Sequence, residues 1–250
     1  MYTPYETYQN YTTGAQNKTG AKWYNTLILA VFAGIFIAFG AVASNAASAT
    51  FSGSAASVLK AAVFPIGLTL VVLFGAELFT GNCLLIAPAL GKDIKVTALF
   101  KNWGIVYLGN LTGSVLIAVI VVYCGVQTGA VKDACYLTAA NKCDMNFGIA
   151  LLRGIPCNML VCLAVWFALS AKSVTGKILS LYLPVFAFVV CGFEHSVANM
   201  YYLTAGLLSG GGLNAGYAIL NCLIPSTLGN IIGGALIALS IYFLHGRKKN

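Results

Sequence analysis

Charged side chains, and acidic ones above all, are scarce in this chain. Its 250 residues include only six Asp and Glu against 14 Lys and Arg, so that 8% are charged while 59% are hydrophobic. The mean hydropathy is +0.86. A soluble domain of this size needs a far larger charged surface, about a quarter of its residues. The shortage excludes a soluble globular protein and predicts an all-α membrane protein that crosses the bilayer several times.

Residues that build catalytic and metal centres are also few. The chain has two histidines and eight cysteines, and the cysteines do not show the spacing of zinc ligands. It contains no nucleophile–base motif and no cofactor fingerprint. We therefore expect no enzymatic activity, no metal and no cofactor. Cys135 and Cys143 share a predicted loop and form a candidate disulfide.

A cleavable signal and a nucleic-acid-binding domain are missing as well. Residues 1–22 are polar, with neither a basic start nor a small-residue cleavage site. We interpret them as a polar cytoplasmic segment with an interfacial helix near Lys18. The net charge is +8, but the basic residues cluster at the ends of apolar runs. We therefore expect a lipid bilayer, and no nucleic acid, as the surroundings of this chain.

What the chain does have is six apolar runs within residues 23–250, which we interpret as a single six-span transmembrane domain. The runs cover residues 25–44, 58–88, 103–126, 147–171, 178–208 and 217–244. The segments at 45–57, 91–101 and 127–146 are predicted loops. Because about 20 residues cross a bilayer, the second and fifth runs are too long for one straight helix.

Both long runs carry a carboxylate in their middle, Glu77 and Glu194. A charge at that depth costs at least about 2.5–3.5 kcal/mol, so it is rare and usually functional. The two stretches share the frame Gly-x-Glu-x-x-x-x-Asn, which begins at Gly75 and at Gly192. Irregular backbone at membrane depth is tolerated where it lines a cavity or is buried in protein. We therefore predict broken helices at spans two and five.

The similarity between the two halves continues downstream. Gly109-Asn110 and Gly229-Asn230 form a second matching pair, 120 positions apart, whereas Glu77 and Glu194 are 117 positions apart. We interpret this as an internal duplication, with repeat one at about 25–126 and repeat two at about 147–244. Each repeat holds three spans, an odd number, so the 3+3 repeat must be inverted. The two breaks then meet near the middle of the bilayer.

The distribution of lysine and arginine predicts the orientation. If both termini are cytoplasmic, ten of the fourteen basic residues lie on the cytoplasmic side, among them Lys18, Lys172 and the tail Arg247-Lys248-Lys249. We therefore predict a multi-pass protein of the cell inner (plasma) membrane with cytoplasmic N and C termini.

The groups that meet at the breaks suit a small monovalent anion. Half-helix N-termini present backbone N–H donors and a positive dipole end. The polar candidates are Thr80, Asn82, Asn158, His195, Ser196 and Asn199. Apolar side chains are available for narrow gates that work by size and dewetting. These gate candidates are Phe64, Leu68, Leu78, Phe79, Phe188 and Phe193.

Several of these residues also have a purely structural interpretation. We expect Glu77 and Glu194 to be buried carboxylates satisfied by backbone N–H groups of the breaks, because a free negative charge would repel an anion in a low-dielectric pore. A membrane histidine often serves as a polar link between helices. Beside a helix break, a functional role for His195 is favoured. Lys142, on sequence alone, is an ordinary loop lysine.

Four motifs resemble the formate/nitrite transporter family. They are Glu77–Gly81, Lys101–Trp103 with Gly109-Asn110, Cys157–Ala164 and Glu194–Met200. The resemblance covers essentially everything after the first 20 residues. It implies an aquaporin-like protomer of six helices, a homopentamer, and one substrate path through each protomer.

The resemblance also implies roles for individual residues. The family's central histidine corresponds to His195, the lysine that makes its pore centre positive to Lys142, its loop threonine to Thr80 and its asparagine to Asn158. Its constrictions correspond to Phe64, Leu68 and Val161 on one side, and to Leu78, Phe79 and Phe188 on the other. We add Glu194, Asn199 and Arg153 to the pathway, and Glu77, Gly81 and Asn82 to the structural loop.

Two positions depart from the formate-channel pattern. Gly81 stands where those channels have serine, and Arg153 stands where they have an apolar residue. Both features resemble the nitrite and hydrosulfide branches of the family, and the extra cation is expected to widen the anion vestibule. Formate, nitrite and hydrosulfide all stay open as the substrate.

We therefore predict a channel or transporter for small monovalent anions of weak acids. The proton that neutralises the anion comes either from His195 or from bulk water. A water or neutral-solute pore is an alternative, but the paired Asn-Pro-Ala boxes expected there are missing. A membrane-embedded enzyme that uses His195 and Glu194 is the other alternative, and it lacks a recognisable catalytic motif.

Overall fold

The computed structural model describes residues 1–246, and the regular elements in that part of the chain are all helical. Five helices there are long and apolar enough to cross a membrane: Trp23–Ser48, Gly53–Phe74, Val96–Tyr123, Phe147–Ser170 and Ala215–Gly246. Two shorter apolar helices cover Phe79–Leu90 and Val174–Val190. The predicted all-helical membrane architecture is confirmed at this level.

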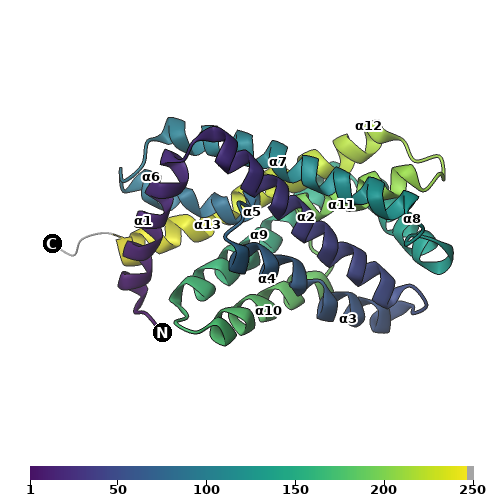
Figure 1. The fold of residues 1–250 in the computed structure, drawn as a ribbon, viewed down its shortest axis with the longest axis horizontal. Helices are drawn as coiled ribbons and strands as arrows, with labels where there is room; N and C mark the ends of the chain where they lie inside the picture. Colours follow the sequence, from purple (N-terminus) through teal and green to yellow (C-terminus); the bar gives the residue numbers. More distant parts are fainter. Residues whose placement is uncertain (247–250) are drawn as a thin grey trace.

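The first half of the chain contains two long helices with several short ones between them (Figure 1). Its elements are α1 (Pro4–Gly20), α2 (Trp23–Ser48), α3 (Gly53–Val63), α4 (Pro65–Phe74), α5 (Phe79–Asn82), the 3₁₀ turn η1 (Cys83–Leu85), α6 (Ile86–Leu90) and α7 (Val96–Tyr123).

The second half follows the same plan. Its elements are α8 (Gly129–Cys143), α9 (Phe147–Ser170), α10 (Val174–Val190), α11 (Ser196–Leu208), α12 (Ala215–Tyr217), the π-helical turn η2 (Ala218–Leu223), α13 (Ile224–Ile241) and the π-helical turn η3 (Tyr242–Gly246).

Side-chain caps explain why several of these helices begin where they do. The Thr3 hydroxyl accepts a hydrogen bond from the backbone N–H of Glu6, and the Glu6 carboxylate accepts from the Thr3 N–H at 2.8 Å. This capping box starts α1, and the bonds from the Thr3 backbone and hydroxyl lower the pKa of the Glu6 carboxyl. Asn146 caps α9 by accepting from the Ile149 N–H at 2.8 Å.

The most extensive helix–helix packing in the described residues is that of α2 against α7 and of α9 against α13. Both depend on glycine. A Cβ at Gly113 would collide with the Val31 carbonyl oxygen, and one at Gly233 would collide with the Ile155 carbonyl oxygen. Small residues let helix backbones approach closely where lipid offers no hydrophobic driving force. Each half is therefore held together by the same kind of helix crossing.

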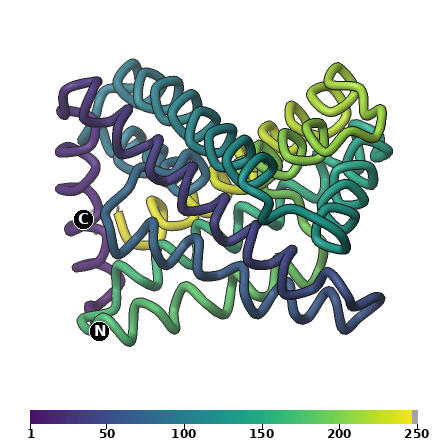
Figure 2. The backbone as a smooth tube through the Cα atoms, turned by 45° about the vertical axis from the view of Figure 1, so that its right-hand side comes forward, coloured from purple at the N-terminus to yellow at the C-terminus, as the bar shows by residue number. Residues whose placement is uncertain are grey.

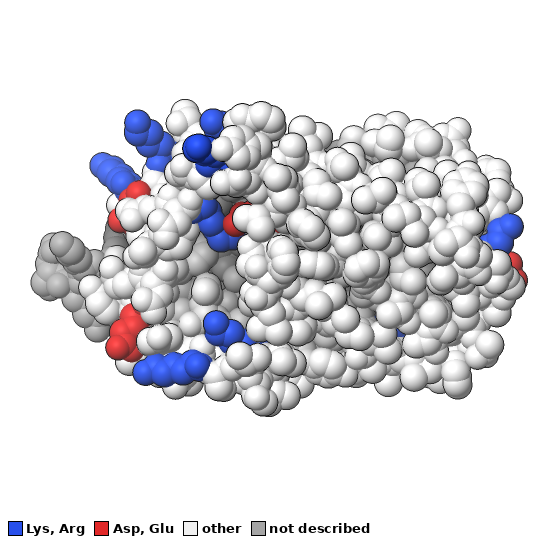
Figure 3. All heavy atoms as spheres, viewed as in Figure 1, with Lys and Arg blue, Asp and Glu red and all other residues white. Residues whose placement is uncertain are grey.

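The two ends of the molecule carry different caps. Helix α1 and turn η3 lie at one end, where Trp166 stacks on His245 with ring centroids 6.1 Å apart, while α8 and α12 lie at the other (Figures 1 and 2). In Figure 3, lysine and arginine gather mainly at the α1 end, and a wide band almost free of charge covers the middle. An uncharged band between charged ends is what a bilayer core requires.

The predicted loop at 127–146 is wrong, because α8 occupies most of it. The buried face of α8 consists of Cys135, Ala139 and Cys143, which are spaced four residues apart. Small side chains at that spacing do not produce a hydrophobic stripe that a sequence pattern reveals. The candidate disulfide is also wrong, because both cysteines lie on α8. Eight residues of helix hold the two cysteines about 12 Å apart, and both are free.

Two other predicted loops are shorter than expected. Helix α2 continues to Ser48 and α3 already begins at Gly53, so little of 45–57 is irregular. Helix α7 begins at Val96, inside the predicted loop at 91–101. Alanine and serine sustain the helix ends within 45–57 without an apolar signature. The predicted basic tail Arg247-Lys248-Lys249 lies outside the described residues.

Candidate functional site

The chain leaves regular helix at two related places. Helix α4 ends at Phe74 and α5 begins at Phe79, while α10 ends at Val190 and α11 begins at Ser196. Gly75 and Gly192 follow the first helix of each pair with φ of 77° and 68°. This left-handed conformation is routine only for glycine. After this turn the chain is extended at Leu78 and His195, and Glu77 and Glu194 are buried.

One asparagine holds each break in place. The Asn110 side chain accepts from the Phe79 N–H at 2.9 Å and donates to the carbonyls of Glu77 at 2.9 Å and Ala30 at 2.8 Å. The Phe79 N–H and the Glu77 carbonyl belong to the break, where no helical bond pairs them, whereas the Ala30 carbonyl lies within α2. Asn110 is itself fully buried. The first break is therefore held in place by several buried hydrogen bonds.

The second break has the same arrangement. The Asn230 side chain accepts from the Ser196 N–H and donates to the carbonyls of Glu194 and Gly154, all three at 2.8 Å. Asn230 is also fully buried. The two asparagines are the matching pair seen in the sequence, and they make equivalent bonds.

Both break carboxylates are buried and satisfied by side chains. Glu77 accepts from the Asn82 amide at 2.6 Å and pairs with Lys18 at 2.8 Å. Glu194 accepts from the Asn199 amide at 2.8 Å and pairs with Lys142 at 2.6 Å. The expectation that backbone N–H groups satisfy them is therefore wrong. Each carboxylate binds the asparagine one turn further on and a lysine from elsewhere.

His195 lies where the two breaks meet. Its Nε2 is 2.9 Å from the Thr80 hydroxyl, and its Nδ1 accepts from the Ala198 N–H at 3.0 Å. Because Nδ1 accepts, Nε2 carries the hydrogen of the neutral ring and points it at Thr80. The Phe188 ring stacks on the imidazole, with centroids 5.8 Å apart. A single side chain from the second break thus faces the hydroxyl of the first.

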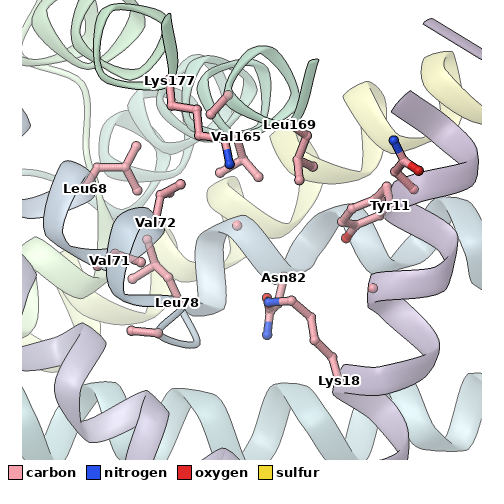
Figure 4. A pocket seen from close by; sticks show the side chains of 16 residues that line it. Tyr11, Lys18, Leu68, Val71, Val72, Leu78, Asn82, Val165, Leu169 and Lys177 are labelled. Carbon is pink, nitrogen blue, oxygen red and sulfur yellow. The ribbon is translucent and has the colours of Figure 1, made fainter. Parts of the chain in front are cut away.

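Two cavities approach this centre from opposite ends. The α1-side cavity, of about 270 Å³, is lined by residues of α1, α4, the first break, α9 and α10. In Figure 4, Lys18 extends towards Asn82, and Lys177 enters from α10 beside Val165. The α8-side cavity, of about 220 Å³, is lined by residues of α3, α8, α10 and the second break, including His195, Lys60 and Lys142.

An apolar layer separates the two cavities. Leu68 and Leu78 line the α1-side cavity, while Phe64 and Phe188 line the α8-side cavity. The Phe64 and Phe188 rings meet edge to face, with centroids 5.8 Å apart. All four side chains are no more than 3% exposed. A hydrated ion would have to shed water to pass them.

Comparison with known proteins places this arrangement in a family. The model of the formate/nitrite transporter family matches residues 5–244. The chain belongs to the formate/nitrite transporter family. It is 42% identical over 233 residues to the uncharacterized transporter YrhG of Bacillus subtilis (strain 168). The aligned region covers 90% of this chain and 86% of YrhG.

Solved structures of the family have the same fold. A chain described as an FNT family ion channel superposes with a TM-score of 0.87 at 26% identity, over 95% of this chain and 98% of that one. A pentameric formate channel with formate bound superposes with a TM-score of 0.80 at 34% identity, over 89% and 96%. The family is one of transport channels rather than enzymes, and the chain is a membrane protein.

Not every residue predicted for the pathway of this formate/nitrite transporter lines a cavity. Val161 is buried and lines neither. The Phe79 ring packs instead on Trp103 and Tyr107 of α7, with centroids 5.8 and 5.0 Å away. The exposed Arg153 side chain contacts Met145 at 3.6 Å and lines neither cavity.

Asn158 is buried beside the centre. Its amide donates to the Asn230 carbonyl at 2.6 Å, and its Oδ1 has no hydrogen-bond partner within the described chain. The structural loop residues lie together, since Gly81 and Asn82 both line the α1-side cavity. Asn199 lines the α8-side cavity with Glu194.

Sequence reasoning missed three lysines that line the cavities, Lys18, Lys60 and Lys177. Lys18 comes from α1, outside the repeats, so no local pattern links it to Glu77. Lys60 and Lys177 are 117 positions apart. That spacing equals the offset between Glu77 and Glu194. A search for other basic residues at this offset could therefore have identified Lys60 and Lys177 from the sequence.

Proposed function

We propose that this chain forms a membrane channel or transporter for small monovalent anions of weak acids, with one substrate path through each protomer. The observation that carries the proposal is the contact between His195 and Thr80. It is buried between two cavities that both carry lysine. Lysine attracts an anion into either cavity. The neutral hydrogen-bonding centre then replaces water that the apolar layer removes.

We infer six spans in an inverted 3+3 repeat. Helices α3 to α6 form the second span and α10 with α11 the fifth. Equivalent bonds of Asn110 and Asn230 support the repeat. Tyr107 and Thr227, which are 120 positions apart, touch each other at 3.0 Å. Repeat-related residues meet in this way at a two-fold axis, which for inverted repeats lies in the membrane plane.

We infer a homopentamer in the cell inner membrane, with the α1 end in the cytoplasm. The structural neighbour described as pentameric supports the assembly. The gathering of lysine at the α1 end on the face of Figure 3 supports the orientation, since cytoplasmic ends carry more Lys and Arg. Residues 1–22 then form a cytoplasmic cap, and residues 23–250 form one channel domain.

Formate is the first substrate to test, followed by nitrite and hydrosulfide. A neighbour at 34% identity binds formate, according to its description. Arg153 does not support a wider vestibule, because it lines neither cavity. Gly81 lines the α1-side cavity, so the departure from the formate-channel pattern at this position still bears on selectivity.

In the proposed mechanism the anion enters a cavity, loses water at the apolar layer and meets His195 and Thr80. The Nε2 hydrogen of His195 is already directed into the centre by the bond that Nδ1 accepts from Ala198. A proton from this position, or from water that reaches it, turns the anion into a neutral acid. A neutral acid crosses an apolar constriction at far lower cost than an ion.

The test is uptake by liposomes that contain the purified protein, with formate, nitrite, hydrosulfide, chloride and lactate compared at two pH values. We expect saturable flux of one weak-acid anion that rises as pH falls. His195→Asn should lower that flux about tenfold or more and flatten its pH dependence. Unchanged rate, selectivity and pH dependence in His195→Asn would remove the proton role.

Thr80 provides the matched control. Thr80→Val removes the hydroxyl at nearly constant volume, whereas Thr80→Ser keeps it. We expect the serine variant to retain most of the flux and the valine variant to lose several-fold, about the worth of one hydrogen bond to the substrate. Absence of flux for every anion, in protein shown to be folded and pentameric, would count against the proposed function.

A further inference from the structure

Each cavity carries two lysines in different electrostatic states. In the α8-side cavity, Lys142 is paired with Glu194 at 2.6 Å. In the α1-side cavity, Lys18 is paired with Glu77 at 2.8 Å. Such pairs are close to neutral when seen from a distance. The remaining cations are Lys60 and Lys177, and neither is paired with a carboxylate of the described residues.

Lys60 and Lys177 hold the same place in the two halves. They are 117 positions apart, as are the left-handed glycines Gly75 and Gly192. Lys60 lies on α3, which α4 follows before the first break, and Lys177 lies on α10, which leads into the second break. Both side chains are half-buried. The duplication therefore places one unpaired lysine in each cavity, at opposite ends of the molecule.

The surroundings of each lysine suit an anion. The Lys60 ammonium donates to the Thr138 hydroxyl at 3.3 Å. Both residues also line a neighbouring cavity of about 430 Å³, where the Asp133 carboxylate forms no ion pair with Lys60. The Lys177 side chain points into the α1-side cavity, between α9 and α1 (Figure 4). Counting formal charges, Lys60 leaves the α8-side cavity positive by one unit after the Lys142–Glu194 pair cancels.

We propose that Lys60 and Lys177 are the anion-recruiting residues of this chain, one at each mouth of the pathway. Each forms an entry subsite for a monovalent anion. Lys60 acts together with the Thr138 hydroxyl. The paired lysines, Lys142 and Lys18, hold the breaks in shape. This inference rests on the proposed function, because it assigns the entry step of the same pathway.

The physical basis is electrostatic focusing. A single unpaired charge in a narrow cavity with low-dielectric walls raises the local concentration of counter-ions. The effect is strong at low ionic strength and is screened at high salt, where the Debye length falls to about 3 Å at 1 M. A paired lysine contributes little at the same distance, so the two kinds of lysine are distinguishable by experiment.

The experiment measures initial formate uptake into liposomes at low and high ionic strength for Lys60→Gln, Lys177→Gln and the double variant. We expect each single variant to raise the half-saturating formate concentration about three- to tenfold at low salt, with a smaller change in the maximal rate. The loss should largely vanish at about 1 M salt. The double variant should show the product of the single effects.

Lys60→Arg and Lys177→Arg keep the charge and should restore near-native half-saturation, which a merely structural role would not predict. The matched controls are Lys132→Gln on α8 and Lys95→Gln before α7. Both lysines are exposed and line neither cavity. These controls should leave uptake unchanged. If one charge-removing variant fails to fold, the other tests the proposal alone.

The outcomes separate this inference from the proposed function. Wild-type flux with unaltered half-saturation in both glutamine variants would overturn the inference and leave the proposed function standing. Losses that do not depend on salt would also overturn it, because they indicate a structural defect. No weak-acid flux in folded wild-type protein would overturn the proposed function and this inference with it.

Discussion

The two breaks, residues 75–82 and 192–199, share a frame but differ in content. Both begin with a left-handed glycine, bury a carboxylate against an asparagine amide, and are held by an asparagine from a later helix. At the position of Leu78 in the first break, the second has His195. Likewise Phe79 corresponds to Ser196, and Thr80 to Val197.

The difference separates what builds the fold from what acts at its centre. The frame is duplicated because each half must satisfy the same unpaired backbone groups inside a membrane. The central pair is not duplicated, since His195 comes from one break and Thr80 from the other. A central site thus needs both halves, although either half alone carries the complete frame.

The largest expected effect tests whether the frames are equivalent. Asn110→Ala and Asn230→Ala each remove three buried hydrogen bonds. We expect each to lower the free energy of unfolding by about 3 kcal/mol, because one N–H and one carbonyl of the break are left buried without a partner. The third bonded group, the carbonyl of Ala30 or Gly154, lies within a helix and keeps its helical bond. Unfolding by SDS in mixed micelles measures this loss.

Aspartate is the matched substitution at both sites, since it keeps the accepting oxygen and loses both donors. Asn110→Asp and Asn230→Asp should retain the bond from the N–H of Phe79 or Ser196. The two asparagines are not equivalent if one alanine variant lowers the free energy of unfolding much more than the other, for example by about 2 kcal/mol.

A smaller effect should distinguish the two ion pairs. Lys142 is 14% exposed in its side chain, whereas Lys18 is 31% exposed. Glu194→Gln therefore leaves a more deeply buried unpaired ammonium, and we expect a loss of about 2–3 kcal/mol. Glu77→Gln should cost about 1 kcal/mol, because water reaches Lys18. The same unfolding titration ranks the two.

The double variant Lys142→Gln with Glu194→Gln checks the explanation. Removing both charges should recover part of the stability that Glu194→Gln loses, since no buried charge is left alone. A reversed ranking, with Glu77→Gln the more destabilising, would contradict the difference in burial between the two ends.

The smallest effect concerns the contact between the halves. Tyr107→Phe and Thr227→Val each remove one hydrogen bond between repeat-related positions. We expect a loss of about 0.6 kcal/mol for each, and no further loss when they are combined. Additive losses in this double-mutant cycle would show that the two side chains act independently.

Much of the frame was visible in the sequence. The Gly-x-Glu-x-x-x-x-Asn pattern located both breaks, and the repeated Gly-Asn pair located the asparagines that hold them. These residues are recognisable because polar side chains stand out in an apolar run. The family motifs placed His195 and Thr80, which the structure brings to 2.9 Å.

Other parts of the site followed no local pattern. Phe79 was predicted as part of a constriction, but its ring packs on α7, and ring direction depends on the turn that begins α5. Lys142 looked like a loop lysine until α8 placed it beside Glu194. Polar and small residues built α8 without a periodic apolar stripe.

The sequence by itself determined that this chain is a membrane protein, and it predicted that two of the spans are broken and that the two halves are duplicated. Scarcity of charge and the cost of a buried carboxylate are enough for those conclusions. Only the tertiary structure decided which lysine neutralises which glutamate. Such pairing depends on helices far apart in the chain, and an ion pair forms where side chains meet at about 4 Å or less. Within the described residues, that choice leaves Lys60 and Lys177 as the lysines that line the two cavities without a carboxylate partner.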